Sequence, residues 1–140
     1  LMTYEVYSAG GMMTTDPVIL NADATVADAL AAVRRKELAP ALAAQVFVCR
    51  SPLETPTGRL LGIVHVQRLL REPPALKLGV IVDSVAMTLS PDSGLNEVVK
   101  QLANYNLIAA PVVDENERLL GAVTVDDVLD HLLPANWRSA

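Results

Sequence analysis

The sequence predicts an α/β (α+β) fold built from two similar halves, and two repeats along the chain support this prediction. An apolar spacing typical of one helix face occurs twice, 69 positions apart (95 − 26). Its residues are Val26, Ala29, Leu30 and Val33, and then Leu95, Val98, Val99 and Leu102. The run Leu-Leu-Gly occurs at residues 60–62 and again at residues 119–121, 59 positions apart (119 − 60). Hydrophobic residues make up 51% of the chain and aromatic residues only 4%, which favours an interior of small aliphatic side chains.

Each half is predicted to run strand, helix, strand, strand, helix. In the first half the strands are residues 17–20, residues 45–48 and a strand through Gly62, and the helices are residues 26–33 and 66–70. In the second half the strands are residues 85–88, residues 111–113 and a strand through Gly121, and the helices are residues 95–102 and 125–133. A half of about 60 residues buries little surface alone, so we expect the two pseudo-symmetric motifs to pack sheet to sheet. Their interface then provides clefts, in which ligands tend to bind.

The repeat also sets the expected domain organisation. Residues 1–11 are expected to link to a preceding domain, residues 12–74 and 75–137 to form the two motifs, and residues 138–140 to form a tail. The chain begins with Leu1, which suggests a piece of a longer protein. The two displacements differ by ten residues (69 − 59), and we expect the extra residues in a long loop at 50–58, which is rich in proline. Pro73-Pro74 is expected to end the first closing helix.

Composition excludes several classes of function. The net charge of −5, without a basic block, argues against a nucleic-acid partner. Cys49 is the single cysteine, so an intrachain disulfide and a cysteine metal cluster are both excluded, and an intracellular location is the simpler interpretation. The chain has no apolar run near the ~20 residues that span a bilayer, so we expect no direct membrane insertion of this fragment.

A candidate phosphate and ribose site lies where the last strand meets the final helix. Thr124 ends the strand and Asp127 follows three residues later, in the first turn of the helix. A helix start offers free backbone N–H groups to a phosphate, the threonine hydroxyl can donate to it, and the carboxylate can accept from ribose hydroxyls. The alternative is a capping box that needs no ligand, and Thr25-x-x-Asp28 has the same form.

The first half differs at the matching place, where His65 and Arg68 stand for the threonine and the aspartate. Arginine cannot accept a hydrogen bond from ribose, so this half is expected to have lost the nucleoside contact. Arg68 then either reaches a phosphate in the neighbouring site or is an ordinary solvated side chain. The histidines, His65 and His131, have no neighbouring cysteine or histidine, which argues against zinc. The sequence holds no nucleophile elbow and no phosphate-binding loop, so we expect no enzyme.

Two carboxylates form a candidate metal site on the final helix. Asp126 and Asp130 are four residues apart and share one helix face. Magnesium takes oxygen ligands and keeps several waters, so such a pair can hold it weakly. The alternative is that both side chains only solvate the surface.

The repeat and two runs in the second half together resemble the CBS domain family. The runs are residues 106–114, Asn-Leu-Ile-Ala-Ala-Pro-Val-Val-Asp, and residues 121–127, Gly-Ala-Val-Thr-Val-Asp-Asp. The resemblance implies that Thr124 and Asp127 contact the phosphate and ribose of AMP, ADP, ATP or a related adenosyl ligand. It also implies that Ala110, just before the proline, lines the base pocket.

A narrower resemblance concerns residues 9–14, Ala-Gly-Gly-Met-Met-Thr, and residues 124–130. Both are similar to the CBS region of MgtE-type magnesium transporters. This implies a cytoplasmic regulatory module that follows a helical domain, forms a homodimer through its CBS pair, and gates transport when Mg²⁺ binds its acidic residues. Asn106 stands where such transporters can carry an aspartate ligand. The alternative is an adenosyl-nucleotide sensor in a soluble protein not linked to transport.

Overall fold

The computed structural model describes residue 4 and residues 6–35, 37–85, 87–105 and 107–133. In chain order the elements of the first part are α1 (Ala9–Met12), β1 (Ile19–Leu20), α2 (Val26–Val33), α3 (Pro40–Ala43), β2 (Gln45–Cys49), β3 (Leu60–His65) and α4 (Val66–Leu69). They are followed by α5 (Leu78–Ile81), α6 (Leu95–Asn104), β4 (Ala109–Val113), β5 (Leu119–Thr124) and α7 (Val125–Leu132). The predicted helices at 26–33, 66–70, 95–102 and 125–133 and the second and third strands of each half are confirmed to within two residues at each described end.

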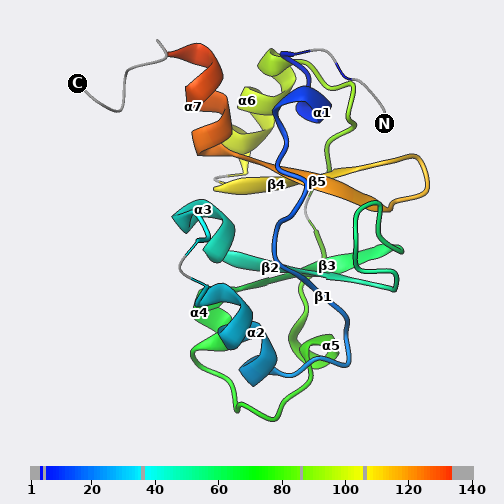
Figure 1. Ribbon diagram of the computed structural model, residues 1–140, viewed down its shortest axis with the longest axis vertical. Helices are drawn as coiled ribbons and strands as arrows, with labels where there is room; N and C mark the ends of the chain where they lie inside the picture. Colours follow the sequence, from blue (N-terminus) through cyan, green and yellow to red (C-terminus); the bar gives the residue numbers. More distant parts are fainter. Residues whose placement is uncertain (1–3, 5, 36, 86, 106, 134–140) are drawn as a thin grey trace.

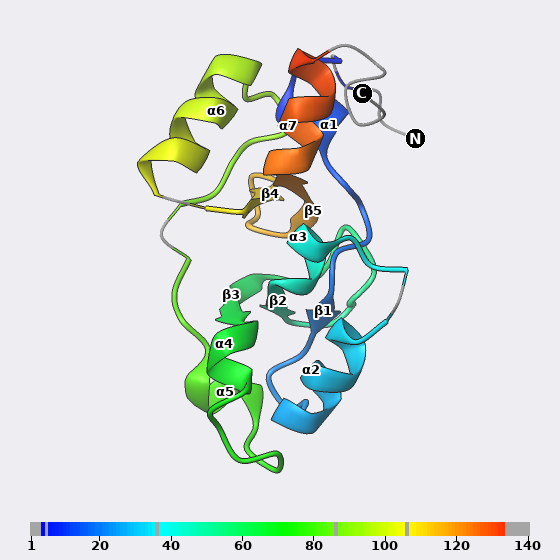
Figure 2. The ribbon, with the colours of Figure 1, turned by 90° about the vertical axis from the view of Figure 1, so that its left-hand side faces the viewer.

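Two sheets lie face to face in the middle of an elongated molecule (Figure 1). One sheet has the order β1-β2-β3, with β1 parallel to β2 and β2 antiparallel to β3, and the other pairs β4 with β5 antiparallel. Helices α1, α6 and α7 cover one end of the molecule and α2, α4 and α5 the other, as the turned view also shows (Figure 2). The predicted α+β fold with sheet-to-sheet packing is therefore confirmed.

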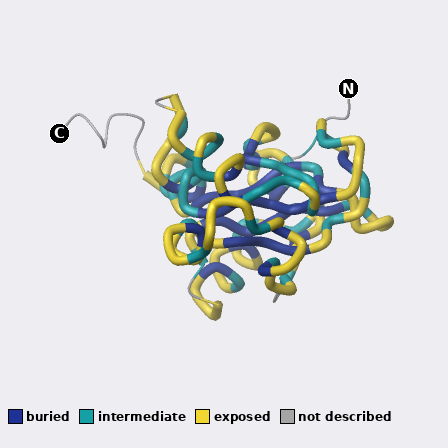
Figure 3. Tube along the Cα trace, turned by 90° about the horizontal axis from the view of Figure 1, so that it is seen from below, coloured by how far each residue is buried: buried dark blue, intermediate teal, exposed yellow. Residues whose placement is uncertain are grey.

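The core between the halves comes from the inner faces of both sheets. Phe47, Cys49 and Ile63 from the first sheet pack against Val113, Leu119 and Ala122 from the second. The buried part of the chain follows the strands, whereas the exposed part lies in the outer loops and helices (Figure 3). Burial raises the pKa of the Cys49 thiol, and a hydrogen bond with Thr57 offsets part of that effect.

The predicted strand at residues 85–88 is wrong. Val85, Met87 and Thr88 are not in a strand, and Ala86 lies outside the described residues. Instead Leu89 forms an isolated parallel bridge with Val112. The 69-residue displacement explains this position, because it carries Leu20 at the end of β1 onto Leu89 (20 + 69). The second half therefore keeps one residue of pairing where the first half keeps a short strand.

The ten extra residues of the first half are divided between two places, and not confined to the loop at 50–58. The start of β2 lies 19 residues after the start of α2 (45 − 26), against 14 in the second half (109 − 95). The start of β3 lies 15 residues after that of β2 (60 − 45), against 10 (119 − 109). The first excess includes the helical turn α3, which begins at Pro40, a residue favoured at the first position of a helix.

The repeat also reaches two helical turns that the periodicity did not predict. Helix α1 packs on the second half, where Ala9 and Met12 join its core, and α5 packs on the first half through Leu78 and Ile81. The two turns are related by the same displacement of 69 residues (78 − 9). Each half thus receives its first helical turn from the chain segment that leads into the other half.

A glycine stands at each of the two places where a segment that connects the halves passes close to a sheet. The carbonyl oxygen of Asp83 lies against Gly62, and that of Thr14 lies against Gly121, where a Cβ would meet the oxygen at 2.5 Å. Backbone hydrogen bonds join Ile63 to Asp83 and Ala122 to Thr14 at these crossings. A side chain on either glycine would therefore push a bridging segment away from the sheet.

The loops that connect the two antiparallel strand pairs differ between the halves. In the second half, Asp114 closes a tight turn, accepting hydrogen bonds from the backbone N–H groups of Asn116 and Arg118 and from the Arg118 side chain at 2.8 Å. Burial tends to raise the pKa of Asp114, but these hydrogen bonds and the Arg118 charge outweigh it and hold the pKa below its usual value. In the first half, the longer loop buries Thr57, which exchanges hydrogen bonds with Leu119 of β5. That loop therefore ties the two sheets together.

Candidate functional site

Thr124 and Asp127 form a reciprocal capping box at the start of α7. The Thr124 hydroxyl oxygen accepts from the Asp127 N–H at 3.0 Å, and Oδ2 of Asp127 accepts from the Thr124 N–H at 2.9 Å. This arrangement uses one acceptor of each side chain. The hydroxyl hydrogen of Thr124 and Oδ1 of Asp127 have no hydrogen-bond partner among the described residues. The capping box therefore leaves one hydrogen-bonding group of each side chain unused, and Thr124 is only 4% exposed.

Helix α2 carries the same box and provides an internal reference. Thr25 accepts from the Asp28 N–H at 3.2 Å, and Asp28 accepts from the Thr25 N–H at 3.0 Å. The box by itself therefore serves the helix and does not identify a ligand site. What distinguishes Thr124 is its position beside the other half of the molecule. Its strand partner Ala109 accepts a hydrogen bond from Gln45 of the first half.

The matching corner of the first half has no box. His65 is the N-cap of α4 but makes no side-chain hydrogen bond to it, and its side chain is exposed. Arg68 pairs with Glu72 at 3.5 Å, one turn further along the chain. Helix α4 has four residues, whereas α7 has eight. The helix that begins at the first corner is therefore shorter and less well capped than the helix that begins at the second.

A cavity of about 270 Å³ opens between the halves at the uncapped corner. Its lining comes from the starts of β2 and α4 and from the segment before β4: Ala44, Gln45, His65, Val66, Gln67, Leu107 and Ile108. Ala110 does not line this cavity but is fully buried in the core of the second half. The sequence singles out His65 for its place opposite Thr124, and Leu107 and Ile108 lie in the run 106–114, but it does not predict that these residues line a cavity with Gln45. The repeat could also have indicated Gln67, which stands opposite Asp126 (126 − 59).

Asp126 and Asp130 both lie on α7, with Asp126 partly buried and Asp130 exposed. Within the described part of the chain, no group of three or more His, Cys, Asp or Glu side chains is arranged to hold a metal ion. His131 is not part of such a group either. Its Nδ1 lies 2.9 Å from the Asp127 carbonyl oxygen, and its ring packs edge-on against Tyr7. Among the described residues, Asp126 and Asp130 are therefore not part of a group of three or more such side chains that could hold magnesium.

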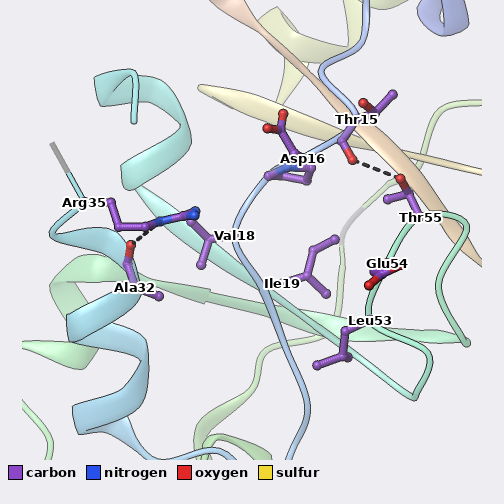
Figure 4. Close-up of a pocket in the computed structure, with 10 residues that line it drawn as sticks. Thr15, Asp16, Val18, Ile19, Ala32, Arg35, Leu53, Glu54 and Thr55 are labelled. Atoms are coloured by element: carbon purple, nitrogen blue, oxygen red, sulfur yellow. Dashed lines mark hydrogen bonds between the residues drawn. The ribbon is translucent and has the colours of Figure 1, made fainter. Parts of the chain in front are cut away.

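A second cavity, of about 550 Å³, runs along the outer edge of β1 (Figure 4). The Thr55 hydroxyl donates to the Thr15 carbonyl at 2.9 Å and closes one wall, and Arg35 donates to the Ala32 carbonyl at 3.2 Å on the other side. Asp16 and Glu54 also line it. None of the predicted site residues is part of this cavity, so it is separate from the corner at Thr124.

An apolar groove of about 290 Å³ lies between α6 and α7. Its residues include Val99, Leu102, Val125, Val128, Leu129 and Leu132. Three of these large apolar side chains are markedly exposed: Val99 at 38%, Val125 at 38% and Leu132 at 53%. These exposed side chains line the groove together with Leu102 and Val128, which are buried. Among the described residues, no helix has the length and apolar character needed to span a bilayer.

Comparison with known sequences agrees with the repeat. The model of the CBS domain matches residues 9–75 and 80–134. The chain is 33% identical over 132 residues to the magnesium transporter MgtE of Thermus thermophilus and 30% identical over 131 residues to that of Bacillus subtilis. These alignments cover 94% and 93% of this chain but 28% of each relative. The chain thus spans less than a third of the transporters that it matches.

Solved structures show the same similarity. The cytosolic domain of the Mg²⁺ channel MgtE, in complex with ATP, superposes with a TM-score of 0.77 and 32% identity, over 91% of this chain and 50% of that one. The soluble part of a magnesium transporter gives a TM-score of 0.75 and 25% identity, over 92% and 48% of the two chains. With both copies of the domain matched in sequence and in fold, the chain belongs to the CBS domain family and is similar to the CBS region of MgtE-type transporters.

Proposed function

We propose that this chain is the regulatory CBS-pair module of an MgtE-like magnesium transport protein, with a sensing role and no catalytic one. The observation that carries the proposal is the similarity to MgtE transporters, which extends over both halves and 94% of the chain. On this proposal the module lies in the cytoplasm, follows a helical domain of the same parent chain, and alters transport by changing how two copies are arranged.

The first ligand that we propose is an adenine nucleotide at the Thr124–Asp127 corner. The similar cytosolic domain of MgtE was crystallised with ATP. In this chain the Thr124 hydroxyl would donate to a phosphate and Oδ1 of Asp127 would accept from the ribose hydroxyls, since the capping box leaves both groups available. The cavity beside Gln45 would receive the base, because it adjoins this corner through Ala109.

The second ligand that we propose is Mg²⁺ near Asp126 and Asp130. Two carboxylates one helical turn apart form only part of a site, and Mg²⁺ keeps several waters when so few ligands are offered. The remaining ligands would come from the preceding domain or from the second copy. Ion binding would then favour one arrangement of the parts, because its removal leaves like charges facing one another.

The homodimer would form through the groove between α6 and α7. A second copy is the occupant that we propose, because a two-fold contact covers the same apolar residues, Val99, Val125 and Leu132, on both subunits at once. The mass in solution, measured by light scattering, should be that of a dimer for wild type and of a monomer for Leu132→Glu. A monomeric wild type would contradict this part of the proposal.

Calorimetric titration with ATP tests the nucleotide ligand. Wild type should bind, and Asp127→Ala should weaken binding by about 1–3 kcal/mol, because ribose loses a charged acceptor. Asp28→Ala is the matched control: it removes the same capping box from α2 and should leave ATP affinity unchanged. Absence of ATP binding to wild type, or equal losses in both variants, would overturn the nucleotide ligand.

Thermal unfolding with millimolar MgCl₂ tests the metal ligand. Mg²⁺ that binds the folded form should raise the melting temperature by linkage, and Asp130→Asn should reduce the rise. Glu97→Gln, on the neighbouring helix α6, is the control for general charge effects. A melting temperature that does not depend on Mg²⁺, in the chain extended by its preceding domain as well, would overturn magnesium sensing.

A further inference from the structure

Gln45 is a buried polar side chain held in one orientation. It is 3% exposed, and its Nε2 donates to the backbone carbonyl of Ala109 at 3.2 Å, across the interface between the halves. A carbonyl accepts and cannot donate, so the amide cannot turn over without placing two oxygens against each other. The hydrogen bond to Ala109 therefore fixes the position of the other amide atom, Oε1.

Oε1 of Gln45 is an unused acceptor that faces the cavity. No hydrogen bond from a described residue reaches it. No fully enclosed side-chain oxygen or nitrogen of the described residues lacks a partner, so Oε1 is open to solvent. Because the remainder of Gln45 is enclosed and the residue lines the cavity between the halves, the open oxygen is directed there.

The rest of that cavity suits a flat, uncharged group. Leu107, Ile108 and Val66 offer apolar surface, and no carboxylate, lysine or arginine is among the described residues that line the cavity. A phosphate would find no permanent cation there, whereas a heteroaromatic ring could lie on the apolar side chains. A ring that carries an N–H donor would also satisfy the buried acceptor, and a ring without one would leave that acceptor without its water.

We infer that Gln45 is a specificity-determining residue that selects a heteroaromatic base bearing an exocyclic amine. This inference rests on the proposed function, in which the base of a nucleotide enters this cavity. The amine donates to Oε1, while the Ala109 carbonyl keeps the acceptor in place. Since Ala109 is the strand partner of Thr124, the base and the ribose–phosphate contact neighbouring residues of one interface.

Calorimetric titration of the 140-residue chain with two nucleosides tests this inference. Adenosine carries the 6-amino group, and purine riboside differs only in having hydrogen at that position. Wild type should bind adenosine about tenfold more tightly than purine riboside, as expected for one hydrogen bond to a buried group. In Gln45→Met, which keeps length and apolar packing, the ratio should fall to about one. Gln101→Met, on α6 and away from the cavity, should retain the tenfold ratio.

Two outcomes would overturn the inference, and they differ in what they mean for the proposed function. If wild type binds ATP but shows no preference for adenosine, Gln45 does not select the base and the nucleotide function stands. If neither ATP nor either nucleoside binds, both fail together. Should Gln45→Met not fold, the wild-type ratio still decides. The Gln45 side-chain amide resonances, which should shift with adenosine and not with purine riboside, are a second measurement.

Discussion

The two corners where a last strand meets its closing helix have the same place in the fold but different chemistry. At Thr124 a capping box closes the first turn of an eight-residue helix. At His65 the helix has four residues and no side-chain cap, and the cavity between the halves opens beside it. The halves therefore do not form two equal sites. One corner supplies fixed polar groups and the other supplies space, and in the proposed function the two combine into one composite site.

The largest effect is expected where the halves are still alike. Gly62→Ala and Gly121→Ala should each destabilise the protein by about 1–3 kcal/mol, because the new Cβ collides with a backbone carbonyl of the crossing segment. Gly94→Ala is the control for contacts, since no atom of another segment lies within 4 Å of its added Cβ, and only the smaller cost of alanine at the N-cap of α6 is expected. Urea unfolding measures all three. Equal, small losses at Gly62 and Gly121 would mean that the crossing segments move freely.

Removal of the N-cap side chain should lower stability at one corner and not at the other. Thr124→Ala should cost about 1 kcal/mol of stability, as is usual for the loss of a threonine N-cap, and Thr25→Ala should cost about the same. His65→Ala should change stability by less than about 0.5 kcal/mol, because the side chain is exposed and caps nothing. A loss at His65 as large as that at Thr124 would remove the contrast between the corners.

The contrast can also be reversed by design. The double variant His65→Thr and Arg68→Asp places a capping box at the start of α4, in the spacing that Thr124 and Asp127 use. It should stabilise the protein by about 0.5 kcal/mol, because the gain of a cap exceeds the loss of the exposed Arg68–Glu72 pair. Urea unfolding would measure the gain. A destabilised variant would show that the α4 backbone does not follow the α7 geometry.

The smallest effect on stability is expected at Asp114, in the turn of the second hairpin. The pKa of Asp114 is lowered in the folded state, so its carboxylate adds stability above the usual pKa of 3.8, and that stability is lost as the pH falls through the folded-state pKa. Asp114→Asn should therefore be less stable than wild type at pH 7, with a difference that shrinks below about pH 4. Melting temperatures across this range measure it, and a difference that is constant with pH would contradict the assignment.

Much of the fold could be predicted from the repeat, because apolar spacing reports which helix faces are buried. Helix 26–33 and the strand beginning at Gln45 were located in this way. Helices α1 and α5 were not, since a turn of four residues is too short to show a period, and their exchange between the halves depends on tertiary packing. The strand at 85–88 was wrong because its apolar pattern outweighed the register of the repeat.

The candidate site was predicted only in part. Thr124 and Asp127 stood out because capping and phosphate binding need the same residue types at the same spacing. Gln45 could not be found, because the role proposed for it depends on a hydrogen bond to Ala109, which lies 64 residues away in the chain (109 − 45). Sequence patterns indicate local geometry, whereas a site between two halves depends on which strands meet.

A crystal structure of the chain grown with ATP tests the composite site most directly. The account predicts the base in the cavity between the halves with its amine on Oε1 of Gln45, the ribose hydroxyls on Asp127 and a phosphate near Thr124. ATP bound elsewhere, for example along the outer edge of β1, with the interface between the halves unoccupied, would contradict it.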